Sequence, residues 1–346
     1  MGEFDLIEHY FNRPAHAAAR ADWVKLGIGD DCALLQPRAN TQLAISSDML
    51  VEGRHFFTDV DPEALGHKAL AVNLSDLAAC GAQPIAFTLA LSLPEVNEPW
   101  LAAFSQGLFA LADAHGCQLV GGDTTRGPLN ICITVFGEVP LINAQSQALL
   151  RSGAKVGDDI YVSGTLGEAR LALEVLRGNL SVSDDALATL RLRLERPTPR
   201  VALGLALRGM ATSAIDVSDG LLGDLGHILQ ASAVGATVDT QFALLLIANN
   251  VYYSRVRGQF NQKIGENTDF DTQNTLIGYI LNGGDDYELV FTAPAAAREA
   301  VQAAAASAQT AVTRIGSIEA QTGLRLIDAQ GRSVENRWVS FDHFTS

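Results

Sequence analysis

Cysteines and basic residues are scarce in this 346-residue sequence, and long hydrophobic runs are missing. The four cysteines (32, 80, 117 and 132) form no C-x-x-C pair, and each lies in or beside an apolar stretch. This spacing argues against a zinc site or a disulfide framework and favours buried free thiols in a reducing compartment. No apolar run approaches the roughly 18 residues of a membrane-spanning helix. We therefore expect no transmembrane segment.

The N-terminal stretch MGEFDLIEHYF lacks a basic region followed by an apolar one. That pattern predicts no signal peptide, and with the unpaired cysteines it favours a cytoplasmic protein.

Positive charge is also in short supply, with 24 Lys and Arg against 39 Asp and Glu and a net charge of −15. An excess of negative charge repels nucleic acid and anionic membranes, so neither is an expected partner. It would equally repel a phosphorylated substrate unless cations lay between the carboxylates and the phosphates. The charge balance therefore hints at bound metal ions.

What remains is typical of a globular α/β protein. Hydrophobic residues make up 48% and charged residues 18% of the chain, and its length favours two domains. In the first half, strands are expected at 41–50, 85–93, 117–122 and 130–139, with helices at 63–82 and 98–116. This alternation predicts a mixed α/β architecture in which each domain is a sheet covered by helices.

A polar, turn-like stretch at 140–157 separates the halves, so we place the domains at 1–145 and 146–346. The second half repeats the alternation, with strands expected at 159–164, 287–293, 312–320 and 324–329, and helices at 167–178, 199–210 and 295–308. Residues 241–280 lack periodicity and are rich in Asn, Gln and Gly, which predicts an irregular segment.

Five short stretches share one pattern, an apolar strand that ends in small residues and an aspartate: GIGDD (27–31), ISSDM (45–49), NLSDL (73–77), VGGDTTRG (120–127) and IDVSDG (215–220). Any one of them could be a turn or a helix cap. Five together favour convergence at one site, because the carboxyl ends of strands in open α/β sheets gather ligand groups. Several carboxylates in one pocket repel each other unless cations are bound.

Carboxylates with serine hydroxyls, and no His–Cys cluster, suit hard ions such as Mg²⁺, with Ca²⁺ as a less favoured alternative because no EF-hand loop is present. Mg²⁺ commonly borrows ligands from substrate phosphates, so phosphoryl chemistry is the expected activity. The GGDTTRG glycines and the helix start after Asp219 could offer backbone N–H groups to a phosphate. Neither a P-loop nor a protein-kinase catalytic loop is present.

Seven segments together resemble the successive signatures of bacterial thiamine-monophosphate kinases, within the aminoimidazole ribonucleotide synthetase-like ATP-binding superfamily. They are GIGDDCALL, SSDMLVEGRHF, KALAVNLSDLAACGAQP, GGDTTRGPL, RSGAKVGDDIYVSG, AIDVSDGLLGDLGHI and GGDDYELVF. The resemblance implies the two-domain fold of that superfamily. It also implies ATP-dependent phosphorylation of thiamine monophosphate to thiamine diphosphate, the last step in making that cofactor.

The same resemblance implies site residues. Those matching metal-binding positions, for several Mg²⁺ ions, are Asp31, Ser47, Asp48, Asp76, Asp123, Asp216 and Asp219. Those matching ATP-binding positions are Gly122, Asp123, Arg151 and Ser218. Those matching positions that bind thiamine monophosphate are His55, Asp285 and Phe341.

Two of these positions depart from the family pattern. Asp285 stands where the family has Glu, and Phe341 stands where it has a stacking Trp. A shorter acid and a smaller ring predict weaker substrate binding with function retained.

Family analogy also implies a homodimer in which strands of the N-terminal domains pair between subunits. Two other functions stay open on the residues alone. One is another ATP-using member of the superfamily, such as an aminoimidazole ribonucleotide synthetase-like enzyme. The other is a non-catalytic sensor of nucleotides or divalent cations, in which the acidic cluster only binds.

Overall fold

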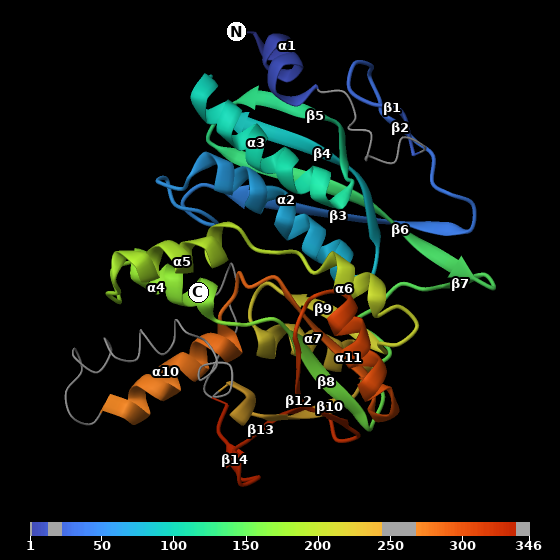
Figure 1. The fold of residues 1–346 in the computed structure, drawn as a ribbon, viewed down its shortest axis with the longest axis vertical. Coiled ribbons are helices and arrows are strands. Elements are labelled where there is room, and N and C mark those ends of the chain that lie inside the picture. The colour runs from blue at the N-terminus through green and yellow to red at the C-terminus, as the bar shows by residue number, and fades with distance from the viewer. Residues whose placement is uncertain (1, 13–22, 244–267, 337–346) are drawn as a thin grey trace. The chain divides into compact units, whose positions relative to one another are not determined.

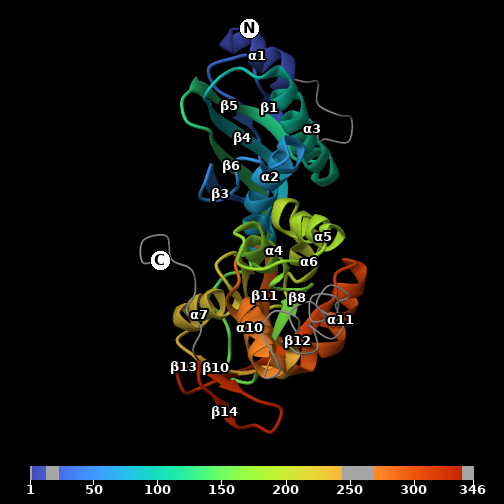
Figure 2. The ribbon, with the colours of Figure 1, turned by 90° about the vertical axis from the view of Figure 1, so that its left-hand side faces the viewer.

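The structure, a computed structural model, describes residues 2–12, 23–243 and 268–336 of the chain. These residues form two compact units, Met1–Ala148 and Leu149–Ser346 (Figures 1 and 2). Each unit combines one main β-sheet with helices. The mixed α/β fold expected from the alternation of strands and helices is therefore confirmed.

Unit 1 is built on a sheet with strand order β3-β6-β4-β5, extended by β7 beside β6. Its strands are β3 (Thr41–Val51), β4 (Gln83–Leu93), β5 (Gln118–Arg126), β6 (Asn130–Ile142) and β7 (Gln145–Ser146). Because β6 is antiparallel to both β3 and β4, and β4 is parallel to β5, strands β3, β4 and β5 run in one direction. Their carboxyl ends therefore lie at the same edge, as the sequence pattern predicted.

Two long helices, α2 (Pro62–Ala79) and α3 (Glu98–His115), pack on one face of this sheet (Figure 1). Both begin at residues that favour helix N-termini. The Asp61 side chain accepts the Ala64 N–H at 2.9 Å, and the Asn97 side chain accepts the Trp100 N–H at 3.2 Å. Helix α3 ends at Gly116, whose φ of 60° is easy only for glycine.

Two glycines allow α2 and α3 to approach each other closely. A Cβ on Gly66 would lie 2.0 Å from the Phe104 carbonyl oxygen, and one on Gly107 would lie 1.8 Å from the Glu63 carbonyl oxygen. No side chain fits at either position without moving a helix backbone. This contact fixes the place of α2, which carries Asp76.

The opposite face of the sheet exposes apolar side chains of the edge strand β3. Leu43, Ile45 and Met49 are 40%, 58% and 52% exposed, and they alternate with residues that point toward α2. We call these three residues the exposed sheet face. Short elements complete the unit: α1 (Glu3–Leu6), the π-helical turn η1 (Ile7–Phe11), and the paired strands β1 (Val24–Leu26) and β2 (Leu34–Leu35).

Unit 2 is built on a seven-stranded sheet of order β14-β13-β10-β12-β8-β11-β9. Its strands are β8 (Asp158–Ser163), β9 (Ser213–Val217), β10 (Gly235–Asp239), β11 (Glu288–Pro294), β12 (Val312–Glu319), β13 (Gly323–Ile327) and β14 (Ser333–Val334). Only the β10–β13 pair is parallel. All five residues of β9 are buried, although β9 is an edge strand of this sheet.

Helices pack on this sheet through an apolar core that includes Ile160, Val162, Leu190, Leu225 and Ile280. They are α4 (Glu168–Leu176), α5 (Asp184–Glu195), α7 (Leu221–Ser232) and α10 (Thr268–Asn282). Helix α11 (Arg298–Ser307), preceded by the 3₁₀ turn η2 (Ala295–Ala297), contacts β11 and also contacts α6 (Val201–Ala206).

Three sequence expectations need correction. Helix α5 was not predicted, and the helix expected at 199–210 is limited to α6. Part of the segment predicted to be irregular is helix α10, whose Leu276, Ile280 and Leu281 are buried on one face. The Asn- and Gln-rich start of this helix masked its short apolar stripe. Residues 244–267 of that segment lie outside the described residues.

The cysteines are free, as expected, but they are not uniformly buried. Cys117 is buried, and burial raises the pKa of its thiol far above the ordinary value. Cys32 is exposed because it follows Asp30 and Asp31 in the turn between β1 and β2. In the part of the chain that the structure describes, no helix is long and apolar enough to cross a lipid bilayer.

Candidate functional site

Strand β3 and helix α2 carry two of the predicted metal residues, Asp48 and Asp76. The Ser46 hydroxyl donates a hydrogen bond to Asp76 Oδ2, and the Asp48 backbone N–H donates to Asn73 Oδ1 at 3.0 Å. Asn73 is buried, and its Nδ2 donates to the Ala69 carbonyl at 2.9 Å. Asn73 thus fixes β3 against α2 and sets the spacing of the two aspartates.

Ser47, also predicted to bind metal, lies on the opposite side of β3 from Asp48. Its hydroxyl donates to the Ile133 carbonyl at 3.2 Å and lies 2.9 Å from Thr134 Oγ1. Side chains alternate along a strand, so Ser46 shares the Asp48 side and Ser47 does not. Sequence reasoning missed Ser46, although the alternation in Ser46-Ser47-Asp48 could have identified it.

Gly122 and Asp123 lie on β5, beyond β6 and β4. The register puts Gly122 in the same row as Asp48, and Asp123 one residue further along. Three strand spacings separate Asp48 on β3 from Gly122 on β5, or roughly 14 Å across the sheet. Asp123 is exposed, as is Asp31 in the β1–β2 turn, where the Asp31 N–H donates to the side chain of Asp30 at 2.8 Å.

Within residues 2–12, 23–243 and 268–336, no three His, Cys, Asp or Glu side chains form a ready metal-binding group. The separation of Asp48 from Asp123 agrees with this. The donors that are present are carboxylate and hydroxyl oxygens, which suit Mg²⁺ better than Zn²⁺ or Cu²⁺.

His55 lies in the turn that follows β3, at the shared carboxyl edge. Its Nδ1 accepts the Val51 N–H at 3.0 Å, and its carbonyl accepts the buried Lys68 ammonium at 3.3 Å. These contacts fix the imidazole, with Nδ1 as the acceptor. The predicted substrate residue is therefore bonded to the end of β3 and to α2.

The turn after β9 carries the predicted residues of unit 2. Asp216 is buried on β9, and the backbone N–H groups of Ser218 and Asp219 both donate to Asp224 Oδ2, at 3.1 and 3.2 Å. Burial raises the pKa of Asp224 to about 7, although these N–H groups oppose the shift. Asp224 is a site residue that the sequence analysis did not find.

The helix that follows this turn begins after Gly220. Gly220 is the N-cap of α7, and no side chain caps it. The Ser218 and Asp219 amides, which precede the helix start expected to face a phosphate, already donate to Asp224. Asp224 lies within the helix, yet it accepts backbone N–H groups as a capping residue before the helix would.

A second loop, residues 283–287, lies along the end of β9. The Asp285 N–H donates to the Ser218 carbonyl and the Tyr287 N–H to the Val217 carbonyl, both at 2.9 Å. The structure thus brings together Ser218, predicted to bind ATP, and Asp285, predicted to bind substrate.

Arg151 is exposed in the loop before β8, where its carbonyl accepts the Ser232 hydroxyl at 3.2 Å. Phe341 lies outside the described residues.

The chain matches two family models that together cover most of its length. They are AIR synthase related protein, N-terminal domain, at residues 29–139, and AIR synthase related protein, C-terminal domain, at residues 155–329. A curated thiamine-monophosphate kinase of Salmonella typhimurium is 46% identical over 347 residues, covering 100% of this chain and 99% of the relative. This chain belongs to the thiamine-monophosphate kinase family.

More distant relatives and solved structures agree with the family assignment. The thiamine-monophosphate kinase of Bacillus subtilis is 32% identical, covering 94% of each chain. The crystal structure of thiamine-monophosphate kinase from Stenotrophomonas maltophilia is 46% identical, with a TM-score of 0.76, and covers 91% of this chain and 93% of its own. The structure of AaThiL complexed with AMPPCP and TMP is 28% identical, with a TM-score of 0.70 and 89% coverage of each chain.

Proposed function

We propose that this protein transfers the γ-phosphoryl group of ATP to thiamine monophosphate, giving thiamine diphosphate and ADP. The observation that carries the proposal is the full-length similarity to curated thiamine-monophosphate kinases, at 46% identity. The relative AaThiL, which was solved with AMPPCP and TMP, supports ATP and thiamine monophosphate as the two substrates.

The reaction needs no protein nucleophile. The acceptor is itself a phosphate, so its oxygen can attack the γ-phosphorus directly, with ADP as the leaving group. This proposal is supported by the residues near Asp48 and Ser218, which are carboxylates, hydroxyls and backbone amides. Direct in-line transfer then depends on positioning and on charge neutralisation.

We propose that several Mg²⁺ ions bind to this protein, held by Asp31, Ser47, Asp48, Asp76, Asp123, Asp216 and Asp219. Bound Mg²⁺ would neutralise phosphate oxygens and the charge that develops during transfer. The oxygen-only donor set supports this choice of ion. The roughly 14 Å between the β3 and β5 positions favours several ions over one.

The remaining residues would bind the substrates. Gly122, Asp123, Arg151 and Ser218 would contact ATP, and His55, Asp285 and Phe341 would contact thiamine monophosphate. The contact between the 283–287 loop and Ser218 supports adjacent binding of the two substrates.

We further propose a cytoplasmic homodimer. Leu43, Ile45 and Met49 on the exposed sheet face offer apolar area that a second copy could cover. Neither nucleic acid nor a membrane is a proposed partner, because the net charge of −15 would repel both.

Product analysis tests the function directly. The protein would be mixed with Mg·ATP and thiamine monophosphate, and thiamine diphosphate would be detected by fluorescence after oxidation to the thiochrome form. We expect ADP and thiamine diphosphate in equal amounts, and ADP formation only with this acceptor. Nucleotide binding without turnover would instead indicate a sensor, and turnover with a different acceptor would indicate another member of the superfamily.

A further inference from the structure

Asp286, beside the proposed substrate residue Asp285, has an unusual environment. It is only 3% exposed, and its Oδ2 accepts the Gly167 backbone N–H at 2.8 Å, just before helix α4. Its other oxygen, Oδ1, has no hydrogen-bond partner among the described residues. A buried carboxylate with an unpaired oxygen is costly, so the group calls for an explanation.

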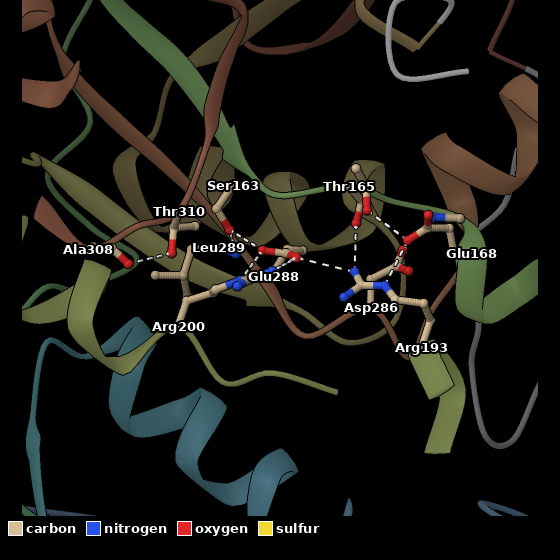
Figure 3. Close-up of polar contacts among 11 residues, drawn as sticks. Ser163, Thr165, Glu168, Arg193, Arg200, Asp286, Glu288, Leu289, Ala308 and Thr310 are labelled. Carbon is tan, nitrogen blue, oxygen red and sulfur yellow. Dashed lines mark hydrogen bonds and ion pairs between the residues drawn. The ribbon is translucent and has the colours of Figure 1, made fainter. Parts of the chain in front are cut away.

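Two arginines and two other carboxylates surround Asp286. Arg193 donates to Glu168 at 2.7 Å and to Glu288 at 3.4 Å, and Arg200 donates to Glu288 at 2.7 Å (Figure 3). Arg193 and Arg200 therefore form their ion pairs with Glu168 and Glu288. Burial raises the pKa of Asp286 well above its ordinary value; the Gly167 N–H and the charge of Arg193 oppose that effect, and the charges of Glu168 and Glu288 add to it.

The loop that contains Asp286 is strained and needs an anchor. Asp285 and Tyr287 have φ angles of 66° and 51°, in the left-handed region that non-glycine residues rarely adopt. Gly284 packs directly on the β9 turn, since a Cβ there would lie 2.5 Å from the Ser218 carbonyl oxygen. Asp286 lies between these two strained residues in the chain, and its side chain accepts a hydrogen bond from Gly167 at the start of α4.

We propose that Asp286 is a positioning residue, whose hydrogen bond with Gly167 holds loop 283–287 against the end of β9 and so sets Asp285 and Ser218 for the two substrates. The expected change in KM for thiamine monophosphate rests on the proposed function. The structural part of the inference, the anchoring of the loop, does not depend on that function. Asp286 would touch neither substrate and would act only through its neighbours.

The test compares Asp286→Ala with Asp286→Asn, which keeps an oxygen able to accept the Gly167 N–H. The matched control is Asp159→Ala. Asp159 is 2% exposed, pairs with Arg298 at 2.6 Å and Arg314 at 3.2 Å, and lies opposite Ala293 at the far end of β11. Each variant would be measured for KM and kcat, for Tm, and for hydrogen–deuterium exchange at the amides of Asp285 and Tyr287.

We expect Asp286→Ala to raise the KM for thiamine monophosphate at least about tenfold, with a smaller effect on kcat, and to speed exchange at both amides. Asp286→Asn should keep KM within about twofold of the wild type. Asp159→Ala should lower Tm without changing KM or the exchange of the loop.

Three results would overturn the proposal: unchanged loop exchange in Asp286→Ala, an equal rise in KM in Asp159→Ala, or a defect in Asp286→Asn as large as in the alanine variant. If Asp286→Ala fails to fold, Asp286→Ser, whose side chain is too short to reach Gly167, replaces it. An inactive wild-type protein would contradict the proposed function, while the exchange measurement would still test the anchor.

Discussion

At the scale of single residues, the site depends on side chains that hold the backbone as much as on those proposed to meet substrate. Asn73 holds β3 to α2 through the Asp48 N–H, Asp224 holds the turn after β9, and Asp286 holds the loop beside it. All three are buried polar groups, and losing any of these hydrogen bonds would leave a buried donor or acceptor unpaired. They therefore link the stability of each unit to the geometry of its part of the site.

The proposed metal ligands should affect turnover far more than folding. We predict that Asp48→Asn and Asp216→Asn each lower kcat by about a hundredfold, because each removes a charge that would hold Mg²⁺. Tm should change little, since Asn is close in size and shape to Asp. Asp113→Asn, at an exposed carboxylate on α3, is the control. A near-normal rate for either ligand variant at saturating Mg²⁺ would count against the assignment.

Asp286 should leave a signature in the pH dependence of stability. An acid whose folded-state pKa is raised costs nothing well below its ordinary pKa of 3.8, where folded and unfolded chains both hold the proton. As the pH rises, the unfolded chain loses the proton first, so the fold is progressively destabilised. Asp286→Asn removes this effect, and its Tm relative to the wild type should increase as the pH is raised above 3.8. A difference in Tm that does not vary with pH would mean that Asp286 is ionised in the fold.

At the scale of elements, what sequence patterns predicted well is what local chemistry determines. The ends of α2 and α3 follow from Asp61, Asn97 and Gly116, and most strands of the two sheets follow from their apolar runs, whereas β10 and β14 were not predicted. Helix α5 was missed although its buried residues, Ala186, Leu190 and Leu194, recur at helical spacing. The role of Asp224 could not be predicted, because it depends on where α7 begins relative to the turn.

The contact between α2 and α3 offers a test at this scale. We predict that Gly66→Ala or Gly107→Ala destabilises unit 1 by about 1–3 kcal/mol, because a methyl group at either position meets backbone of the other helix or its flanking turn. Gly226→Ala, in helix α7 with nothing within 4 Å of the added Cβ, is the control and should be neutral or stabilising by about 1 kcal/mol. Equal effects of the three substitutions on thermal or urea unfolding would refute the close-contact explanation.

At the scale of the whole molecule, the sequence predicted the mixed α/β class and the family, and the motifs that carry the family are spread along nearly the whole chain. The convergence of all the acidic motifs stays a prediction. Asp48 and Asp76 lie on β3 and α2, which are bonded to each other through Ser46 and Asn73, whereas Asp31 and Asp123 are exposed elsewhere in unit 1. Which side chains share a face of one strand can be predicted from the sequence. The distance between residues on different strands depends on the strand order, which the sequence pattern does not give.

Self-association is the prediction that belongs to this scale. We expect light scattering to give a mass of about twice the 36.7 kDa of one chain. Ile45→Asp should shift the mass toward the monomer, because a charge would then lie on the exposed sheet face. Leu192→Asp, at a leucine that is 53% exposed on α5, is the matched control and should leave the mass unchanged. A monomeric wild type, or equal dissociation by both variants, would exclude this face as the interface.

The direct backbone contact between the β9 turn and the 282–287 loop has a consequence for altering substrate preference. A Cβ on Gly220 would lie 2.8 Å from the backbone of Asn282, so the two segments touch with no side chain between them to absorb a change. They are some sixty positions apart in the chain, yet a change in the backbone of one would displace the backbone of the other. Engineering of a new acceptor specificity would have to redesign both segments together. In a library that varied only one segment, most surviving variants would be those whose backbone still packs against the unchanged segment.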